Sequence, residues 1–527
     1  MHEIRDKLRH ERAHLHEKSK RGFLHFLFGR STLILLLLAA QVFLLIGLFA
    51  RWQFSAYAYG LSYALSAFMA IYLLNHPMNA TSRQTWLILV LLLPVLGTLL
   101  YIYVDMDIGH RLVRGRLEQI GRETAGLLPR QERLMEAVRI AEPELHSLAN
   151  YTLRVGGFPI YTDTHVDYFP QGEDKFPALL EALERAEKFI FMEYFIIDEG
   201  YMWGSVLEIL ARKARHGVDV RVLYDGTCAV FRLPYRYPEK LRAMGIQCKM
   251  FSPIRPLVST HYNNRDHRKI VVVDGHTAFT GGINLADEYI NRKEVYGHWK
   301  DTAIMLRGPA VRSFTLMFLQ MWHVTEWKVE YAPYLSAPIP PAPPEPGFVL
   351  PYGDNPFDDE RVGEAIYLDI INRAERYVHI MTPYLIIDGE MTCALTLAAK
   401  RGVDVKLILP HIPDKKSAFS LAYTHYRELL RAGVQIFEYT PGFVHAKVFV
   451  SDDEKAVVGT INLDYRSLYL HFECAAYLFQ MPVIDDIERD FHNTLKRCQQ
   501  VTLESMKHDR LYRKVLGPLL KLFAPLM

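Results

Sequence analysis

The sequence predicts N-terminal transmembrane helices followed by an α/β region, in which two repeated domains face each other in a pseudo-two-fold arrangement. Three observations support this fold class. Three apolar stretches without charged residues occupy residues 31–50, 52–75 and 84–104. After residue 150, apolar runs of strand length alternate with amphipathic runs of helix length, which is typical of mixed sheets flanked by helices. Finally, the two halves of that region resemble each other.

Composition narrows the class of protein. The chain has 527 residues, half of them hydrophobic, which is enough for two or three domains. Lys and Arg number 61 against 59 Asp and Glu, so the positive excess that most nucleic-acid binders carry is missing, and we expect no nucleic-acid partner. The cysteines show no metal-ligand spacing and are expected to be reduced structural thiols: Cys228, Cys248, Cys393, Cys474 and Cys498.

The N-terminal region is predicted to anchor the chain in a membrane. Residues 1–30 form a basic segment, and residues 31–110 a transmembrane region with two or three helices, because each apolar stretch approaches the ~20 residues that a spanning helix needs. Basic residues lie on both sides of this region, so either one stretch does not span or the basic segment is exported. Residues 111–150 are predicted to form a helical connector.

The repeat defines the two domains. AEKFIFMEYFIID (186–198) resembles AERYVHIMTPYLIID (374–388), and RHGVDVRVLYDG (215–226) resembles KRGVDVKLILPH (400–411). We therefore predict a first domain at 151–332 and a second at 348–527, joined by a proline-rich linker at 333–347. The second domain ends in an amphipathic helix that either closes the domain or lies on a membrane surface.

Each half carries the same motif, H-x-K-x4-D, followed at the same offset by an asparagine. A single match is expected by chance only on the order of 0.05 times in a chain of this length. Two copies within a wider repeat therefore indicate a functional site. The residues are His267, Lys269, Asp274 and Asn284 in the first half, and His445, Lys447, Asp452 and Asn462 in the second.

The spacing predicts how the motif residues point. On a strand, residues i and i+2 share a face, so each histidine projects together with its lysine. Each motif aspartate lies five positions after its lysine, so its side chain points to the opposite face of the strand. The two aspartates are therefore expected to have a structural role at the strand end. Each asparagine follows a glycine-containing turn, where its amide can donate to a phosphate oxygen.

Together these groups suit phosphodiester chemistry. One imidazole attacks phosphorus to give a phosphohistidine, and the other protonates the leaving alkoxide and later deprotonates the acceptor. The lysines and asparagines neutralise the phosphate oxygens, so neither a metal ion nor a cofactor is expected.

A catalytic imidazole needs a partner that fixes its tautomer. Asp301 and Glu473 occupy equivalent places after the two asparagines, and we predict that Asp301 orients His267 and Glu473 orients His445. Tyr194 and Tyr384 are expected in the core. Five further histidines are interpreted as structural or as residues at the rim of the substrate site: His261, His298, His379, His411 and His471.

The duplicated motif resembles the phospholipase D superfamily, and the surrounding sequence resembles bacterial cardiolipin synthases. The resemblance covers most of residues 84–527, including TWLILVLLLPVLGTLLYIY (85–103), RDHRKIVVVDG (265–275), PGFVHAKVFVSDD (441–453) and NLDYRSLYLHFE (462–473). It implies two phospholipase D-like domains. It also implies reversible, metal-free transfer of a phosphatidyl group between two phosphatidylglycerol molecules, which gives cardiolipin and glycerol through a phosphatidyl-histidine.

The same resemblance implies a multi-pass protein of the bacterial plasma membrane with cytoplasmic catalytic domains, phosphatidylglycerol and cardiolipin as partners, and His267 as the nucleophile. Three alternatives remain: a hydrolytic phospholipase D that uses water as acceptor, a nuclease of the same superfamily, and an inactive membrane scaffold. The predicted anchor favours transfer, the charge balance disfavours a nuclease, and the intact motifs disfavour a scaffold. The sequence itself leaves open which histidine is the nucleophile, whether other donors such as phosphatidylethanolamine are used, and the oligomeric state.

Overall fold

The computed structural model describes residues 52–105, 108–252, 264–326, 328–340, 345–358, 360–508, 517, 520 and 521. These form two compact units, one made mainly of residues up to 112 and the other of residues from 113 onward.

The N-terminal unit contains three helices, α3 (Trp52–Asn75), α4 (Ala80–Leu92) and α5 (Pro94–Asp105). They pack around a small apolar core of Met69, Leu73, Trp86, Val90 and Tyr101. Helices α4 and α5 approach closely at Gly97, where an added Cβ would lie 2.5 Å from the carbonyl oxygen of Leu89. Only glycine therefore fits this contact.

The prediction of transmembrane helices is wrong for the described residues, because none of their helices is both long enough and apolar enough to cross a membrane. The stretch at 84–104 is divided by Pro94, which ends α4 after 13 residues and begins the 12-residue α5. Helix α3 is long enough, but its Gln, Ser and Tyr side chains lower its mean hydropathy. The expectation of a multi-pass protein in the bacterial plasma membrane depended on these helices, and it is contradicted together with them. The stretch at 31–50 and the basic segment 1–30 lie outside the described residues.

The larger unit is built on two mixed sheets that share the same order over seven strands, and the second sheet has one additional edge strand, β17. The first runs β1-β8-β6-β5-β2-β3-β4, and the second β9-β16-β15-β14-β10-β11-β12-β17. In each, three neighbouring strands are parallel and the others antiparallel. The first sheet comprises β1 (His165–Phe169), β2 (Phe189–Tyr194), β3 (Asp219–Asp225), β4 (Gln247–Phe251), β5 (Lys269–Val273), β6 (Thr277–Gly281) and β8 (Ala303–Arg307). The second comprises β9 (Phe348–Asp354), β10 (Tyr377–Met381), β11 (Asp404–Pro410), β12 (Gln435–Tyr439), β14 (Val448–Ser451), β15 (Lys455–Gly459), β16 (Glu473–Phe479) and β17 (Cys498–Val501).

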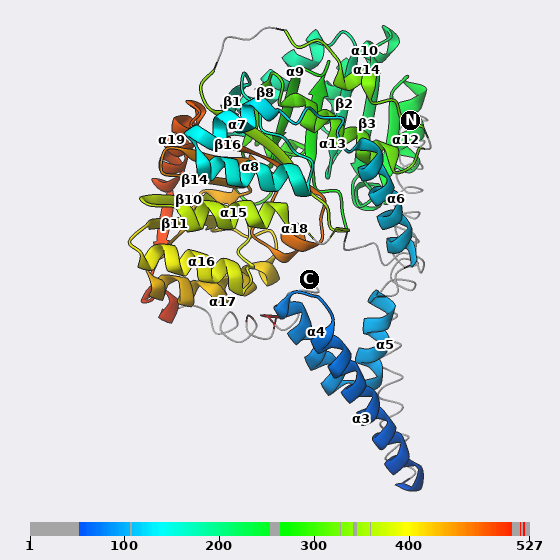
Figure 1. Ribbon diagram of the computed structural model, residues 1–527, viewed down its shortest axis with the longest axis vertical. Coiled ribbons are helices and arrows are strands. Elements are labelled where there is room, and N and C mark those ends of the chain that lie inside the picture. Colours follow the sequence, from blue (N-terminus) through cyan, green and yellow to red (C-terminus); the bar gives the residue numbers. More distant parts are fainter. Residues whose placement is uncertain are drawn as a thin grey trace, which may run out of the picture. The chain divides into compact units, whose positions relative to one another are not determined.

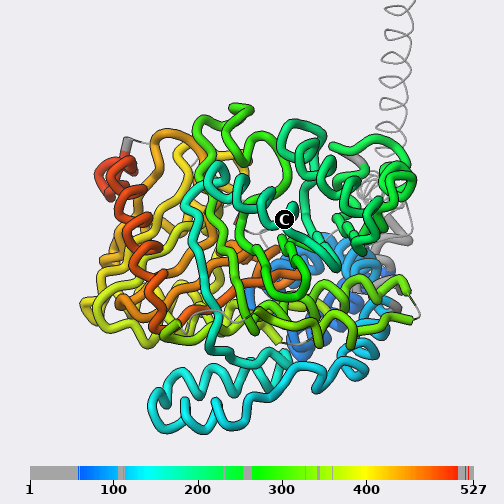
Figure 2. Tube along the Cα trace, turned by 90° about the horizontal axis from the view of Figure 1, so that it is seen from above, coloured from blue at the N-terminus to red at the C-terminus, as the bar shows by residue number. Residues whose placement is uncertain are grey.

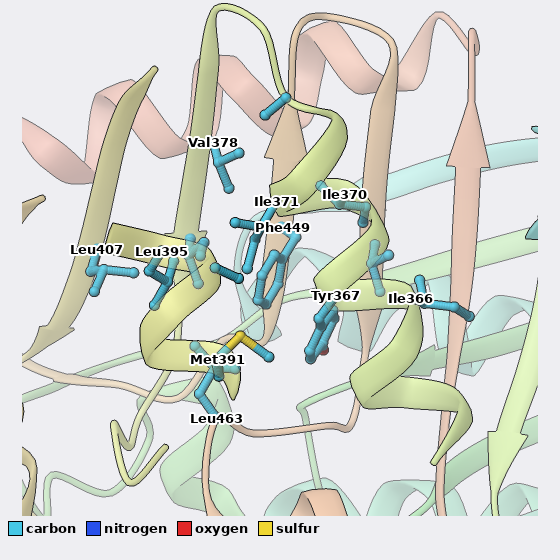
Figure 3. Packing of buried hydrophobic residues seen from close by; sticks show 14 of the residues in the cluster. Ile366, Tyr367, Ile370, Ile371, Val378, Met391, Leu395, Leu407, Phe449 and Leu463 are labelled. Carbon is cyan, nitrogen blue, oxygen red and sulfur yellow. The ribbon is translucent and has the colours of Figure 1, made fainter. Parts of the chain in front are cut away.

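Helices cover the outer face of each sheet (Figure 1). In the first half these include α9 (Gly172–Arg185), α10 (Tyr201–Arg215), α11 (Cys228–Phe231) and α12 (Tyr237–Ala243). In the second half they are α15 (Val362–Arg373), α16 (Gly389–Lys400) and α17 (Lys416–Ala432). Figure 3 shows the resulting core of the second half, where Tyr367 of α15 stacks on Phe449 of β14 with ring centroids 3.9 Å apart. The prediction of two repeated α/β domains with mixed sheets is thereby confirmed.

The inner faces of the two sheets share a third core with α13 (Val311–His323) and α19 (Val483–Leu495). Strand β5 shows the alternation, since Ile270 and Val272 face the shared core while Val271 and Val273 face the outer one. Every residue of β5 is buried, which explains why its sequence is an unbroken apolar run after Lys269.

Shorter elements complete the unit. The predicted connector contains α6 (Ile108–Thr124), α7 (Glu132–Ala141) and α8 (Pro143–Val155), and Figure 2 shows α7 and α8 side by side. Helix α14 (Ala332–Leu335) lies at the start of the predicted linker, and the predicted C-terminal helix falls largely outside the described residues. All five cysteines are free thiols.

Candidate active site

The two histidine motifs lie where the halves join. Strands β7 (His298–Lys300) and β13 (Gly442–Val444) form a parallel pair between the halves, and the Asp266–Phe472 bridge repeats this pairing on the other side. The backbone N–H of His267 consequently donates to the carbonyl of Phe472 (3.0 Å), and that of His445 to the carbonyl of Lys300 (2.7 Å). The two contacts are equivalent, as expected for a pseudo-two-fold site.

Each motif histidine is bonded to a carboxylate of the opposite half. Nδ1 of His267 lies 2.9 Å from Glu473, and Nδ1 of His445 lies 2.6 Å from Asp301. The predicted pairing, Asp301 with His267 and Glu473 with His445, is therefore wrong. The reason is the strand pairing between the halves, which places each histidine beside the residue that follows Lys300 or Phe472. Both carboxylates are fully buried.

The two motif lysines are buried beside the histidines. The Lys269 ammonium donates to the carbonyl of His267, while Nζ of Lys447 lies 2.9 Å from Nδ1 and 3.0 Å from Nε2 of His445. Burial lowers the pKa of Lys269 to about 8 and that of Lys447 to about 7, although Asp301 and Glu473 act in the opposite direction. A bound anion would raise both pKa values and thereby favour the charged ammonium form of each lysine.

Both imidazoles are neutral near pH 7. Burial, with the Lys447 charge acting in the same direction, lowers the pKa of His445 to about 4. Burial and both motif lysines hold the pKa of His267 well below its usual value. Because each Nδ1 faces a carboxylate, the neutral tautomer carries its proton there and leaves Nε2 with a lone pair.

The motif aspartates lie at the strand ends and hold backbone. Asp274 accepts hydrogen bonds from three successive backbone N–H groups at 187–189, at 2.7–2.8 Å. Asp452 does the same for residues 375–377, at 2.8–2.9 Å. Both residues have positive φ, 53° and 57°. They fix the start of β2 and β10 against the motif strands, which is the structural work that their parity predicted.

The two asparagines are buried, and their surroundings differ. Asn284 accepts a hydrogen bond from the N–H of Ile196 (2.9 Å) and donates to the hydroxyl of Tyr289 (2.8 Å). Its amide retains a second N–H for a ligand. In Asn462, the side-chain oxygen has no hydrogen-bond partner among the described residues. Phosphate binding by these residues stays a prediction.

Sequence reasoning missed Lys175 and assigned His471 no specific role. Lys175 is buried on α9, with Nζ 3.3 Å from the Tyr194 hydroxyl, and burial lowers its pKa to about 7. The available signal was its place on the buried stripe of α9 beside Phe176 and Leu179. The ring of His471 lies 5.5 Å from that of His267, whereas His261 lies outside the described residues.

Among the described residues, a buried charge network lies beside the first motif and has no counterpart beside the second. The Arg268 guanidinium lies 2.6 Å from Glu193 and 3.3 Å from Asp266. Strand register places Glu193 opposite Ile270, and Met381 opposite the equivalent Val448. The second half therefore has apolar residues at all three positions: Met381, Val444 and Ala446.

One group of potential metal ligands lies in the site. Ligand atoms of His267, His471 and Glu473 are within 4.8 Å of one another. However, Glu473 already faces His267 Nδ1 and accepts a hydrogen bond from Thr460. The buried ammonium groups of the two motif lysines add positive charge, so the donor set suits an anion better than a cation.

Comparison with known proteins agrees with this geometry. The family profile described as "Cardiolipin synthase, PLD-like domain" matches residues 179–322 and 367–495. Cardiolipin synthase 2 of Bacillus anthracis is 34% identical, over 88% of this chain and 91% of that protein. The chain belongs to the cardiolipin synthase family of the phospholipase D superfamily. Relatives in this family are named cardiolipin synthases, and this enzyme is a phosphatidyltransferase.

Two further relatives extend the comparison. An uncharacterised protein of Streptococcus mutans is 51% identical, over 87% of this chain and 99% of that protein. The crystal structure of phosphatidylserine synthase from Haemophilus influenzae matches with a TM-score of 0.55 and 15% identity, covering 72% of this chain and 97% of that one. At this identity the likeness shows the shared fold alone.

Proposed function

We propose that the protein is a cardiolipin synthase, which transfers a phosphatidyl group from one phosphatidylglycerol to a second and releases glycerol. Relatives named cardiolipin synthase match most of the chain and support the substrate class. The observation that carries the mechanism is the pair of buried, neutral imidazoles, each bonded through Nδ1 to a carboxylate of the other half.

In the first step, His267 is the nucleophile. Its Nε2 has no hydrogen-bond partner among the described side chains, whereas Nε2 of His445 lies 3.0 Å from the Lys447 ammonium. The His267 lone pair attacks phosphorus, the bond from phosphorus to the glycerol oxygen breaks, and His445 gives that oxygen a proton. The bound phosphodiester raises the pKa of His445, and Lys447 supplies the proton across its short contact.

The second step reverses these roles. His445 takes the proton from a hydroxyl of the acceptor phosphatidylglycerol, whose oxygen attacks phosphorus as the bond to His267 breaks. His445 then returns this proton to Lys447, which restores its ammonium. Lys269 balances the charge of the non-bridging oxygens in both steps, Lys447 does so whenever it holds its proton, and Asn284 and Asn462 contribute amide donors. Glu473 and Asp301 stabilise the charged rings that form in each step.

Product analysis tests the proposal. The purified protein is incubated with phosphatidylglycerol without divalent metal, beside His267→Ala, His445→Ala and, as a matched control, His425→Ala, which removes a buried histidine of α17. Cardiolipin and glycerol are expected from the wild type and the control only. Phosphatidic acid as the main product would show a hydrolase instead, and turnover that needs added metal would contradict the two-histidine mechanism.

A further inference from the structure

The two sides of the active site differ at one equivalent position. His267 bonds to the backbone of Phe472, and His445 to that of Lys300, so the residue before each of these occupies the same place beside a catalytic histidine. On the His267 side that residue is His471, and on the His445 side it is Trp299. The ring centroids lie 5.5 and 5.4 Å from the respective catalytic imidazoles.

His471 has unused hydrogen-bonding capacity. Its side chain is only 8% exposed, yet neither ring nitrogen has a hydrogen-bond partner within the described part of the chain. The carboxylate of Glu473 is 3.7 Å from Nδ1, which is too far for a hydrogen bond. Buried polar groups are rarely left without a partner, because the loss of their water is then uncompensated. A bound ligand is the natural partner.

The protonation state defines the ligand. Burial lowers the pKa of His471 to about 3, although the nearby Glu473 carboxylate acts in the opposite direction, so the ring is neutral and offers one donor and one acceptor. Trp299 also has a buried Nε1 without a hydrogen-bond partner among the described residues, but an indole only donates. Only the His267 side can therefore both give and accept a hydrogen bond at this position.

We propose that His471 binds a hydroxyl group of the lipid headgroup beside His267 and thereby selects a glycerol headgroup over an ammonium headgroup. The proposal rests on the phosphatidylglycerol chemistry proposed above and names the residue that recognises it. A hydroxyl donates and accepts, which matches a neutral imidazole, whereas an ammonium group only donates. The buried ammonium groups of Lys269 and Lys447 also disfavour a second cation in the site.

Calorimetric binding of two soluble headgroups tests this without turnover. The probes are glycerophosphoglycerol and glycerophosphoethanolamine, which share the phosphodiester and differ in the terminal group. The wild type is expected to prefer the glycerol compound by about tenfold or more, and His471→Phe to abolish the preference. His471→Asn restores a donor and an acceptor and should recover part of it. The matched control His425→Phe, which removes another buried neutral imidazole, should keep it.

Thermal unfolding separates recognition from a structural role. Because the ring nitrogens lack partners in the described structure, His471→Phe should leave the Tm unchanged or raise it. A large fall in Tm, an unchanged headgroup preference, or no binding of glycerophosphoglycerol by the wild type would each overturn the proposal. The proposed function fails separately, if the wild type prefers the glycerol headgroup but forms no cardiolipin.

Discussion

The buried network of Glu193, Asp266 and Arg268 predicts the outcome of a substitution series. Arg268→Ala removes the cation and leaves Glu193, which is fully buried, without its ion-pair partner. The triple variant Glu193→Met/Asp266→Val/Arg268→Ala copies the apolar residues of the second half into the equivalent positions of the first.

The expected magnitudes differ sharply. Removing one partner of a buried ion pair costs about 3–5 kcal/mol, whereas replacing the whole group with apolar residues is often close to neutral. We therefore expect Arg268→Ala to lower the free energy of unfolding by about 3–5 kcal/mol, and the triple variant to lie within about 2 kcal/mol of the wild type.

The loss should also depend on pH. Burial raises the pKa of the Glu193 carboxyl, and Arg268 acts against this. Without Arg268 the folded-state pKa rises further, so the loss relative to the wild type grows with pH between the folded-state pKa of the wild type, which is already above the unfolded value of about 4.3, and the higher folded-state pKa of the variant. Each unit of upward shift costs about 1.4 kcal/mol once the group must ionise.

Urea unfolding at about pH 5 and about pH 8 measures both effects. The loss in Arg268→Ala should be larger at the higher pH, and the triple variant should recover most of it at both. A triple variant that is no more stable than Arg268→Ala would refute the reasoning, because it would show that the cost comes from lost packing rather than from an unpaired buried charge.

Three further predictions concern the active site. Glu473→Gln and Asp301→Asn should each lower turnover by about 10³- to 10⁴-fold. In protein quenched with alkaline detergent, which preserves the acid-labile phosphorus–nitrogen bond, phosphorus-32 phosphatidylglycerol should leave less label on Glu473→Gln than on Asp301→Asn, because Glu473 orients the nucleophile, whereas Asp301 orients the acid–base group used in both steps; the opposite pattern would exchange the roles of the histidines. Asp452→Ala should lower the free energy of unfolding by about 2–4 kcal/mol in urea, since three N–H groups lose their acceptor, and Asp452→Asn should lose less; equal losses would contradict this role. Binding of glycerophosphoglycerol should weaken as pH rises through the pKa of Lys447, about 7, and of Lys269, about 8, because the cations that bind the anion are lost. Calorimetry from about pH 6 to pH 10 measures this, Lys447→Met should remove the lower step, and a flat wild-type profile would contradict it.

Much of the fold could be predicted because the information is local. The alternation of apolar runs and the repeated segments predicted two α/β domains with mixed sheets, and strand parity predicted the structural role of Asp274 and Asp452 at the strand ends. The membrane helices were predicted from composition alone. That reasoning could not register how Pro94 divides one stretch into two short helices.

The errors at the site have a different cause. An alignment of the two halves shows that Asp301 and Glu473 are equivalent, but equivalence does not say which histidine each one faces. That depends on strand pairing between the halves, which no spacing within one half encodes. The same holds for Lys175, which interacts with the charges of Asp301 and Lys269, and for His471, which lies beside His267. In both cases the interacting residues are far apart in the sequence.

The crosswise bonds between histidines and carboxylates limit how such a chain can be divided. A fragment with only the first half would hold His267 and Asp301, and one with only the second half His445 and Glu473, so neither would contain a correctly oriented imidazole. Two separate fragments should therefore be inactive alone and recover activity when mixed. A single-motif ancestor would have met the same requirement by self-association about a two-fold axis, in which each copy lends its carboxylate to the other.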